Sequence, residues 1–227
     1  MDPLIALKLE KFFSQFQTVS LKKGEIILHA GENPENIFYL KKGYVRMYSI
    51  SEAGKELTLN IFKPKTYFPM IWAIAQIPNN YFFETMTEIE LSHVPKKELI
   101  EFFKKEPKIL YDLSKRVLVG LEGILIRLQY LLFGNAYSRV AAMLLLAASR
   151  FGIKNKNNEI EIQLTFTHQE IANLAGLTRE ATSLEMKKLE KKGLVLSENK
   201  QLIIKSPEKL REESLIYIEE KPLPYTF

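Results

Sequence analysis

A group of side chains suited to hydrogen bonding and charge pairing lies in the stretch THQEIANLAGLTREATSLEMKK, from Thr167 to Lys188. Thr167 and Glu170 have the T-x-x-E spacing of a capping box, in which hydroxyl and carboxylate accept hydrogen bonds from the first N–H groups of a helix. Gly176 interrupts the helical pattern, and Thr178 is placed to cap a second helix. The spacing therefore predicts two short helices joined by a tight corner.

The second of these helices is expected to bury one face and present the other. Thr182, Met186 and Leu189 recur at four- and three-residue steps, so they share the inward face. The outward side begins with mainly polar residues and continues with two lysines: Arg179, Glu180, Ser183, Leu184, Lys187 and Lys188. Such an edge is suited to touching base edges and phosphates of DNA.

A two-stranded hairpin is predicted next, because LVLS and QLIIK flank the turn ENK. Two helices, a corner and a wing make a winged helix-turn-helix, whose second helix enters the major groove of DNA. The alternative is an ordinary two-helix corner whose charges are only solvated.

Catalytic and metal-binding patterns are missing from the sequence. There is no cysteine, which excludes disulfides, thiolate metal sites and cysteine-held iron–sulfur clusters. The histidines His29, His93 and His168 are scattered, so a haem ligand set is not supported. Without a Ser/His/Asp set, a P-loop or paired carboxylates, the sequence predicts no enzyme, no cofactor and no metal site.

Charge and hydropathy bound the class of protein. The net charge is +5 over 227 residues, and from Asn135 onward 14 Lys/Arg face 12 Asp/Glu, so any basic footprint must be local. The start of the chain lacks a signal-peptide layout. The uncharged run from Thr66 to Phe83 is interrupted by prolines and asparagines and makes a poor transmembrane helix. We expect a soluble, cytoplasmic protein with no membrane partner.

The first half of the chain should form a small β domain. After an amphipathic helix (Leu4–Phe16), short apolar runs from Thr18 to about Val94 are separated by KKGE, HAGEN, KKGY and EAGKE. Glycine permits the positive φ that tight turns require. This spacing predicts an N-terminal antiparallel β-barrel, jelly-roll-like, within an α+β fold.

A long helix is predicted from Pro107 to about Phe133, because apolar residues recur at three- and four-residue steps. One stripe is assigned to self-association: Leu113, Val117, Gly120, Ile124, Leu128 and Leu131. A second stripe contains Leu118, Leu121, Leu125 and Leu132. One stripe can cover the barrel, but the other then has no partner within the chain. An unpartnered apolar stripe on a long helix favours pairing with the same helix of a second copy. The alternative is a helix fully buried in one domain.

After the long helix we expect a helix (Ala136–Phe151), a strand around Ile160, Ile162 and Leu164, the helix pair, the hairpin, and a tail EEKPLPYTF that forms a loop or docked arm.

These motifs resemble the CRP/FNR superfamily of bacterial transcription regulators. THQEIANLAGLTREATS…MKKLEKKGLV is similar to its helix-turn-helix, and KKGEIILHAGENPENIFYLKKGYVRMY is similar to its cyclic-nucleotide-binding-type barrel. The resemblance implies a homodimer on two-fold-related double-stranded DNA, with an effector beside the long helix and RNA polymerase as a further partner. By position, Arg179, Glu180 and Leu184 fall where the family reads bases. Thr167, His168 and Lys187 fall where it holds phosphates, and Thr178 and Ser183 complete the predicted DNA-binding set.

The effector site departs from the family's cAMP sensors. The Gly-Glu and Arg-Ser pairs of their phosphate cassette are missing from Thr66–Phe83, although a cyclic phosphate requires a guanidinium fork and helix N–H groups. Ile124 and Leu125 replace an adenine-facing hydroxyl pair. We therefore predict no cAMP binding, unless Arg46 or Arg127 supplied the charge. The region suggests either a core that needs no ligand or a pocket for a small apolar effector lined by Phe68, Met70, Trp72, Phe82, Phe83 and Ile124.

The resulting hypothesis divides the chain into a cyclic-nucleotide-binding-like sensor barrel (1–106), a dimerisation helix (107–134) and a winged helix-turn-helix (135–227). The function predicted is sequence-specific regulation of transcription. The alternative is a ligand-binding signalling module whose winged helix mediates protein–protein contacts.

Overall fold

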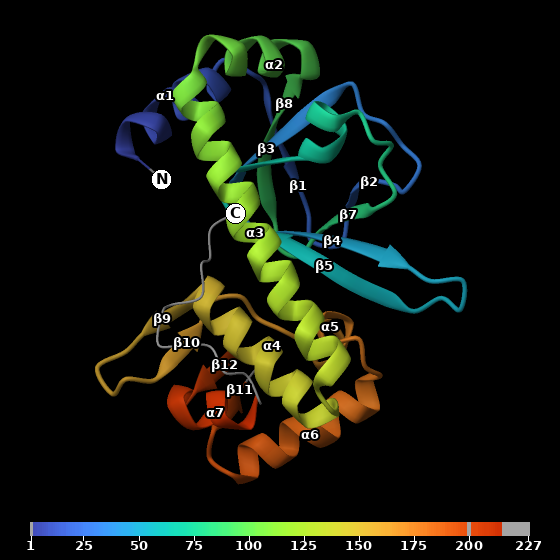
Figure 1. Cartoon of the computed structure of the whole chain (residues 1–227), viewed down its shortest axis with the longest axis vertical. Helices are drawn as coiled ribbons and strands as arrows, with labels where there is room; N and C mark the ends of the chain where they lie inside the picture. Colours follow the sequence, from blue (N-terminus) through green and yellow to red (C-terminus); the bar gives the residue numbers. More distant parts are fainter. Residues whose placement is uncertain (1, 199–200, 215–227) are drawn as a thin grey trace. The chain divides into compact units, whose positions relative to one another are not determined.

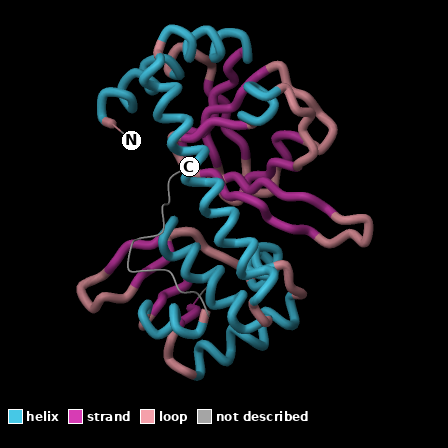
Figure 2. The backbone as a smooth tube through the Cα atoms, in the orientation of Figure 1, coloured by secondary structure: helices cyan, strands magenta, loops and turns pink. Residues whose placement is uncertain are grey.

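The computed structural model describes residues 2–198 and 201–214. The chain divides after Leu118 into two compact units, so the division falls inside one long helix, α3 (Pro107–Phe133). The sequence analysis instead set this helix apart as a segment of its own. Figures 1 and 2 show the order of helices and strands along the chain.

The first unit contains two antiparallel four-stranded sheets. Their orders are β1-β8-β3-β6 and β2-β7-β4-β5, and the two sheets do not close into the barrel that was predicted. The strands are β1 (Thr18–Leu21), β2 (Ile26–Leu28), β3 (Asn36–Lys42), β4 (Val45–Ile50), β5 (Glu56–Phe62), β6 (Thr66–Phe68), β7 (Phe82–Thr85) and β8 (Ile89–Pro95). The jelly-roll-like double sheet is confirmed, whereas a closed hydrogen-bonded cylinder is not formed.

The predicted glycine turns lie between these strands. Gly24, Gly31, Gly43 and Gly54 all have φ between 72° and 89°, the left-handed region. Gly43 is the most restricted, because a Cβ there would lie 2.3 Å from the carbonyl oxygen of Glu88. The turn between β3 and β4 therefore requires glycine for space as well as for backbone conformation.

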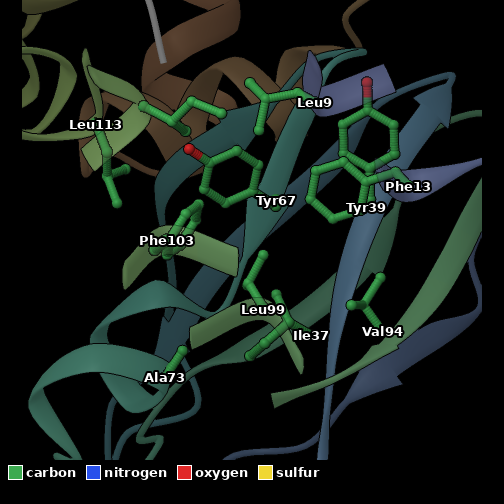
Figure 3. Close-up of a cluster of buried hydrophobic side chains, with 11 residues drawn as sticks. Leu9, Phe13, Ile37, Tyr39, Tyr67, Ala73, Val94, Leu99, Phe103 and Leu113 are labelled. Atoms are coloured by element: carbon green, nitrogen blue, oxygen red, sulfur yellow. The ribbon is translucent and has the colours of Figure 1, made fainter. Parts of the chain in front are cut away.

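Helices close one side of the first unit. They are α1 (Pro3–Phe13), a short π-helix η1 (Ile71–Ala75), α2 (Lys96–Lys105) and the first part of α3. Figure 3 shows the core they share with the strands, where the Phe13 ring of α1 stacks on Tyr39 of β3 at 3.9 Å between centroids. Leu99 and Phe103 bring α2 into the same core. The sequence analysis did not predict α2.

The first turns of α3 contradict part of the predicted dimer stripe. Leu113 is only 7% exposed and packs in the core of the first unit beside Ile109. Gly120 is also buried. From Val117 onward both predicted stripes contain exposed residues: Val117, Leu118, Leu121, Ile124, Leu125, Leu128 and Leu132. Leu113 is thus a core residue because it faces the strands of its own unit, whereas the stripe residues Val117, Ile124 and Leu128 are exposed.

The second unit combines helices with a small sheet of order β11-β12-β10-β9. Its elements are the end of α3, α4 (Ala136–Phe151), β9 (Gly152–Lys154), β10 (Ile160–Ile162), α5 (His168–Ala175), α6 (Arg179–Lys191), β11 (Val195–Glu198), β12 (Gln201–Ile204) and α7 (Pro207–Glu213). The sequence analysis predicted all of these except β9 and α7. Most of the predicted ENK turn and the EEKPLPYTF tail lie outside the described residues. Within the described part of the chain, every helix is too short or too polar to cross a membrane.

Candidate nucleic-acid interface

The capping box predicted for the first helix of the pair is present. The hydroxyl of Thr167 accepts a hydrogen bond from the backbone N–H of Glu170 at 3.1 Å, and the Glu170 carboxylate accepts from the backbone N–H of Thr167 at 2.6 Å. These reciprocal bonds fix the residue at which α5 begins. The first turn of α5 therefore has a defined direction, and N–H groups at a helix start favour anions.

Gly176 forms the corner between the two helices. Its φ of 65° and ψ of 37° lie in the left-handed region, and its N–H donates to the carbonyl of Ala172. Thr178 then caps α6, because its hydroxyl accepts from the N–H of Ala181 at 3.2 Å. The corner is short because glycine turns the chain at once and the next cap follows after one residue.

The two faces of α6 separate as the sequence predicted. Thr182, Met186 and Leu189 are each 0% exposed. Arg179, Glu180, Leu184 and Lys187 are exposed. Leu184 is 56% exposed, so it does not turn inward to fill the core. The outer edge of α6 therefore presents one cation, one anion and one apolar side chain near its start, and a second cation one turn later.

The lysines at the end of α6 differ in their partners. Lys188 pairs with Glu185 at 2.8 Å, and Lys192 pairs with Glu213 of α7 at 2.6 Å. Lys187 has no ion pair within the described residues. The Lys187 ammonium is accordingly available to a phosphate, whereas the charges of Lys188 and Lys192 are partly neutralised by acidic neighbours.

His168 and Ser183 join the two helices. The Nδ1 atom of His168, the first residue of α5, lies 2.6 Å from the hydroxyl oxygen of Ser183 on α6. Both residues are half-buried. The sequence analysis placed Ser183 on the outward edge of α6 as an independent contact, but the hydroxyl is engaged with the imidazole. Spacing alone could not reveal this bond, because the two residues lie in different helices.

The wing is a hairpin of β11 and β12. Val195 pairs with Ile204 and Glu198 with Gln201 across the hairpin, and β12 continues into β10 by pairing Leu202 with Ile162. Leu202 and Ile204 are buried. The wing is therefore one edge of a four-stranded sheet that holds it beside α6.

The residues predicted to line an effector pocket differ in their surroundings. Phe68 and Phe83 are 1% exposed and their rings stack at 5.1 Å in the core between the sheets. Phe82, the strand neighbour of Phe83, instead stacks on Tyr48. Met70 packs against the cluster of Figure 3, and Ile124 lies in the second unit with 61% of its surface exposed. The burial of Phe68 and Phe83 corresponds to the alternative of a core, which gives the same sequence pattern as the lining of a cavity.

The segment between β6 and β7 is held by its own polar side chains. The Trp72 indole N–H donates to the carbonyl of Pro34 at 2.9 Å, and the Lys96 ammonium lies 4.1 Å from the Trp72 ring centre. The amide group of buried Asn79 donates to the carbonyls of His29 and Tyr81 at 3.0 and 2.8 Å. These contacts tie the segment to the preceding loop of the same unit.

The arginines that a cyclic phosphate would require are occupied. Arg46 pairs with Glu56 at 2.6 Å and with Glu84 at 2.7 Å. The pKa of Arg46 is raised above its ordinary value. Burial alone would lower this pKa, but the two carboxylates together raise it by more. Arg127 donates to the carbonyl of Leu174 in the second unit. Neither guanidinium that the sequence analysis considered is therefore directed to a ligand.

Metal binding has no support in the part of the chain that the structure describes, where no group of three or more His, Cys, Asp or Glu side chains is arranged to hold an ion. His93 is exposed on β8, and His29 pairs with Glu32 at 3.4 Å.

Comparisons with known proteins cover both units. Residues 18–106 match the family described as the cyclic nucleotide-binding domain, and residues 138–213 match the Crp-like helix-turn-helix domain. The chain is 29% identical over 183 residues to the transcriptional regulator SdrP of Thermus thermophilus, covering 80% of this chain and 86% of that protein. It is 25% identical over 204 residues to the cAMP-activated global transcriptional regulator CRP of Pasteurella multocida, covering 89% and 96%.

A solved structure has the same fold. A CooA mutant from Carboxydothermus hydrogenoformans superposes with a TM-score of 0.76 at 23% identity, over 90% of each chain. The similar proteins found by sequence are regulators of transcription and not enzymes.

Proposed function

Because this chain belongs to the CRP/FNR superfamily and is a transcription regulator with a helix-turn-helix DNA-binding domain, we propose that it acts as a homodimer that reads a two-fold-related DNA site through α6. Arg179, Glu180 and Leu184 would meet base edges, while Thr167, Thr178, His168 and Lys187 would hold phosphates. As such it is proposed to work in the cytoplasm, with RNA polymerase as its protein partner and no catalytic activity of its own.

The exposed edge of α6 is the observation that carries this proposal. The buried residues of α6 and its exposed residues lie on different sides of the helix. The exposed side begins at the N-terminal turn, which is the part of a recognition helix that meets base edges. The capped start of α5 supplies N–H groups suited to a phosphate nearby.

Self-association is supported by the exposed apolar surface of α3. Ile124, Leu125 and Leu128 are between 46% and 61% exposed on a helix of 27 residues. Apolar side chains repeating on one side of a long helix are buried when a second helix packs alongside. A second copy of the chain supplies such a helix and matches the two-fold symmetry of a palindromic site.

The sensor domain is proposed to work without a cyclic nucleotide. Leaving a cyclic phosphate buried without a cationic partner is strongly unfavourable, and the guanidinium of Arg46 in the first unit is already paired with two carboxylates. Phe68 and Phe83 fill the space between the sheets with their own rings.

Fluorescence anisotropy with a labelled duplex of random sequence tests DNA binding. The wild-type affinity should fall steeply as salt rises, because each neutralised phosphate contributes a slope of about −0.9 in log K against log salt. Replacing Lys187 by alanine removes one phosphate contact from each subunit of the proposed dimer, so the slope should become shallower by about 1.8. Lys97→Ala, which removes an exposed lysine of α2, is the matched control and should leave the slope unchanged. Binding that is insensitive to salt would contradict the proposal and favour protein–protein contacts.

A further inference from the structure

In the hydrogen bond between His168 and Ser183, the tautomer of the imidazole decides which of the two groups donates. A neutral imidazole carries its hydrogen on only one nitrogen, so the ring donates from one side and accepts on the other. The side chain of Ser183 makes no other hydrogen bond within the described residues. Its hydroxyl therefore either donates to Nδ1, leaving the hydrogen on Nε2, or accepts from Nδ1, leaving Nε2 as a bare acceptor.

The surroundings of the ring favour the first arrangement when DNA is bound. His168 is the first residue of α5, directly after the Thr167 cap, and the positive end of the helix dipole attracts phosphate to this point. Phosphate oxygens are acceptors only. An imidazole that presents Nε2–H donates to them, whereas one that presents a bare Nε2 repels them.

We propose that Ser183 is a positioning residue: its hydroxyl donates to Nδ1 of His168, holds the ring in place and fixes the tautomer whose Nε2–H donates to a backbone phosphate. The inference rests on the proposed DNA-binding function and deepens it. Ser183 then reads no base itself. The bond between Ser183 and His168 connects the phosphate contact made from α5 to α6. The imidazole and the recognition helix therefore keep a fixed position relative to each other on the duplex.

A double-mutant cycle tests the link. Kd for a random-sequence duplex would be measured for the wild type and every variant in the same buffer at one pH. His168→Ala should weaken binding by about tenfold for each subunit of the proposed dimer, the usual cost of a hydrogen bond to a charged group. Ser183→Ala should weaken it by about three- to fivefold for each subunit, and Ser183→Thr, which keeps a hydroxyl, should bind nearly as well as the wild type. The double variant should bind no more weakly than His168→Ala alone, because Ser183 acts through the ring.

A second measurement reports the tautomer directly. Nitrogen-15 NMR of the imidazole should show the Nε2–H form of His168 in the wild type and a mixture of both forms in Ser183→Ala. An Nδ1–H ring in the DNA-bound wild type would overturn the inference, as would additive losses in the cycle or full binding by Ser183→Ala. If the wild type binds no DNA, the proposed function fails, and the NMR result still shows whether Ser183 sets the tautomer.

Discussion

The guanidinium of Arg116 on α3 donates a hydrogen bond to the hydroxyl of Tyr67 on β6 and pairs with Asp112 one turn earlier on α3 at 3.1 Å. Tyr67 is 5% exposed, and burial raises its pKa to about 12, with the positive charge of Arg116 opposing part of that rise. The first turns of α3 are thus attached to the strands of the first unit by the hydrogen bond between Arg116 and Tyr67. The apolar contacts of Ile109 and Leu113 add to this attachment.

Tyr67→Phe should reveal this attachment through its pH dependence. At neutral pH the variant should be less stable by about 1–2 kcal/mol, since Arg116 loses an acceptor. The unfolded tyrosine ionises near pH 10 and the folded one near 12, so only the wild type loses the stability that protonated Tyr67 contributes, by about 1.4 kcal/mol at pH 11. The raised pKa values of Tyr39 and Tyr48 act equally in both proteins. The difference between the two proteins in urea unfolding should therefore shrink from about pH 8 to pH 11. A constant difference would contradict the raised pKa.

Ile124→Lys combined with Leu128→Lys should convert the proposed dimer to monomers. The two ammonium groups would face their counterparts across the helix seam, where like charges are strongly unfavourable. Sedimentation velocity should show a halved mass, and DNA affinity should fall because half-sites would be bound singly. A wild-type chain that is monomeric at micromolar concentration would refute the dimer at the outset.

The matched control for this helix adds the same net charge on its polar side. Glu122→Gln combined with Gln129→Lys changes exposed residues outside the apolar stripes. This variant should stay dimeric. Its dissociation would mean that charge alone, and not loss of the apolar seam, separates the copies.

Cyclic nucleotides should leave the protein unchanged. Calorimetric titration with cAMP or cGMP at hundreds of micromolar should give no binding heat, because Arg46 is committed to Glu56 and Glu84. The unfolding free energy should also stay constant, whereas a ligand at 100 times its Kd would raise it by about 2.7 kcal/mol. A saturable titration with either nucleotide would overturn the proposed sensor.

Leu184→Arg should add a base preference. Leucine has no donor for guanine, but the residue is exposed on the outer edge of α6, and an arginine there can bond to O6 and N7 of guanine. Selection of sites from random DNA should yield one additional preferred guanine per half-site, worth roughly 1–3 kcal/mol. Leu184→Met is the control and should select the wild-type site. Identical motifs for wild type and Leu184→Arg would show that this position does not face the bases.

Local signals in the sequence predicted the helix pair well. Thr167, Glu170 and Gly176 act within a few residues of themselves, so their spacing is enough to define caps and a corner. The α6 faces followed from the helical period. The glycines of the β domain predicted its turns for the same reason, since positive φ is a property of single residues.

Features that depend on distant contacts were missed or misplaced. Leu113 and Ile124 look alike in a helical stripe, and only the fold decides that one packs inward and the other is exposed. Phe68 and Phe83 read equally as pocket or core until their stacking is known. The ten-residue helix α2 carried a signal in Leu99 and Phe103, one helical turn apart, but β9 has three residues and is too short for any pattern to emerge.

The separation of α6 into a buried and an exposed side also affects how such a protein can diverge. Substitutions at Arg179, Glu180 and Leu184 leave the packing of Thr182, Met186 and Leu189 untouched, and changes at exposed positions usually shift stability by no more than about 0.5 kcal/mol. After gene duplication, one copy could therefore acquire a new operator through a few surface mutations without passing through unfolded intermediates. A change at Ser183 would not be neutral in this way, because His168 depends on it.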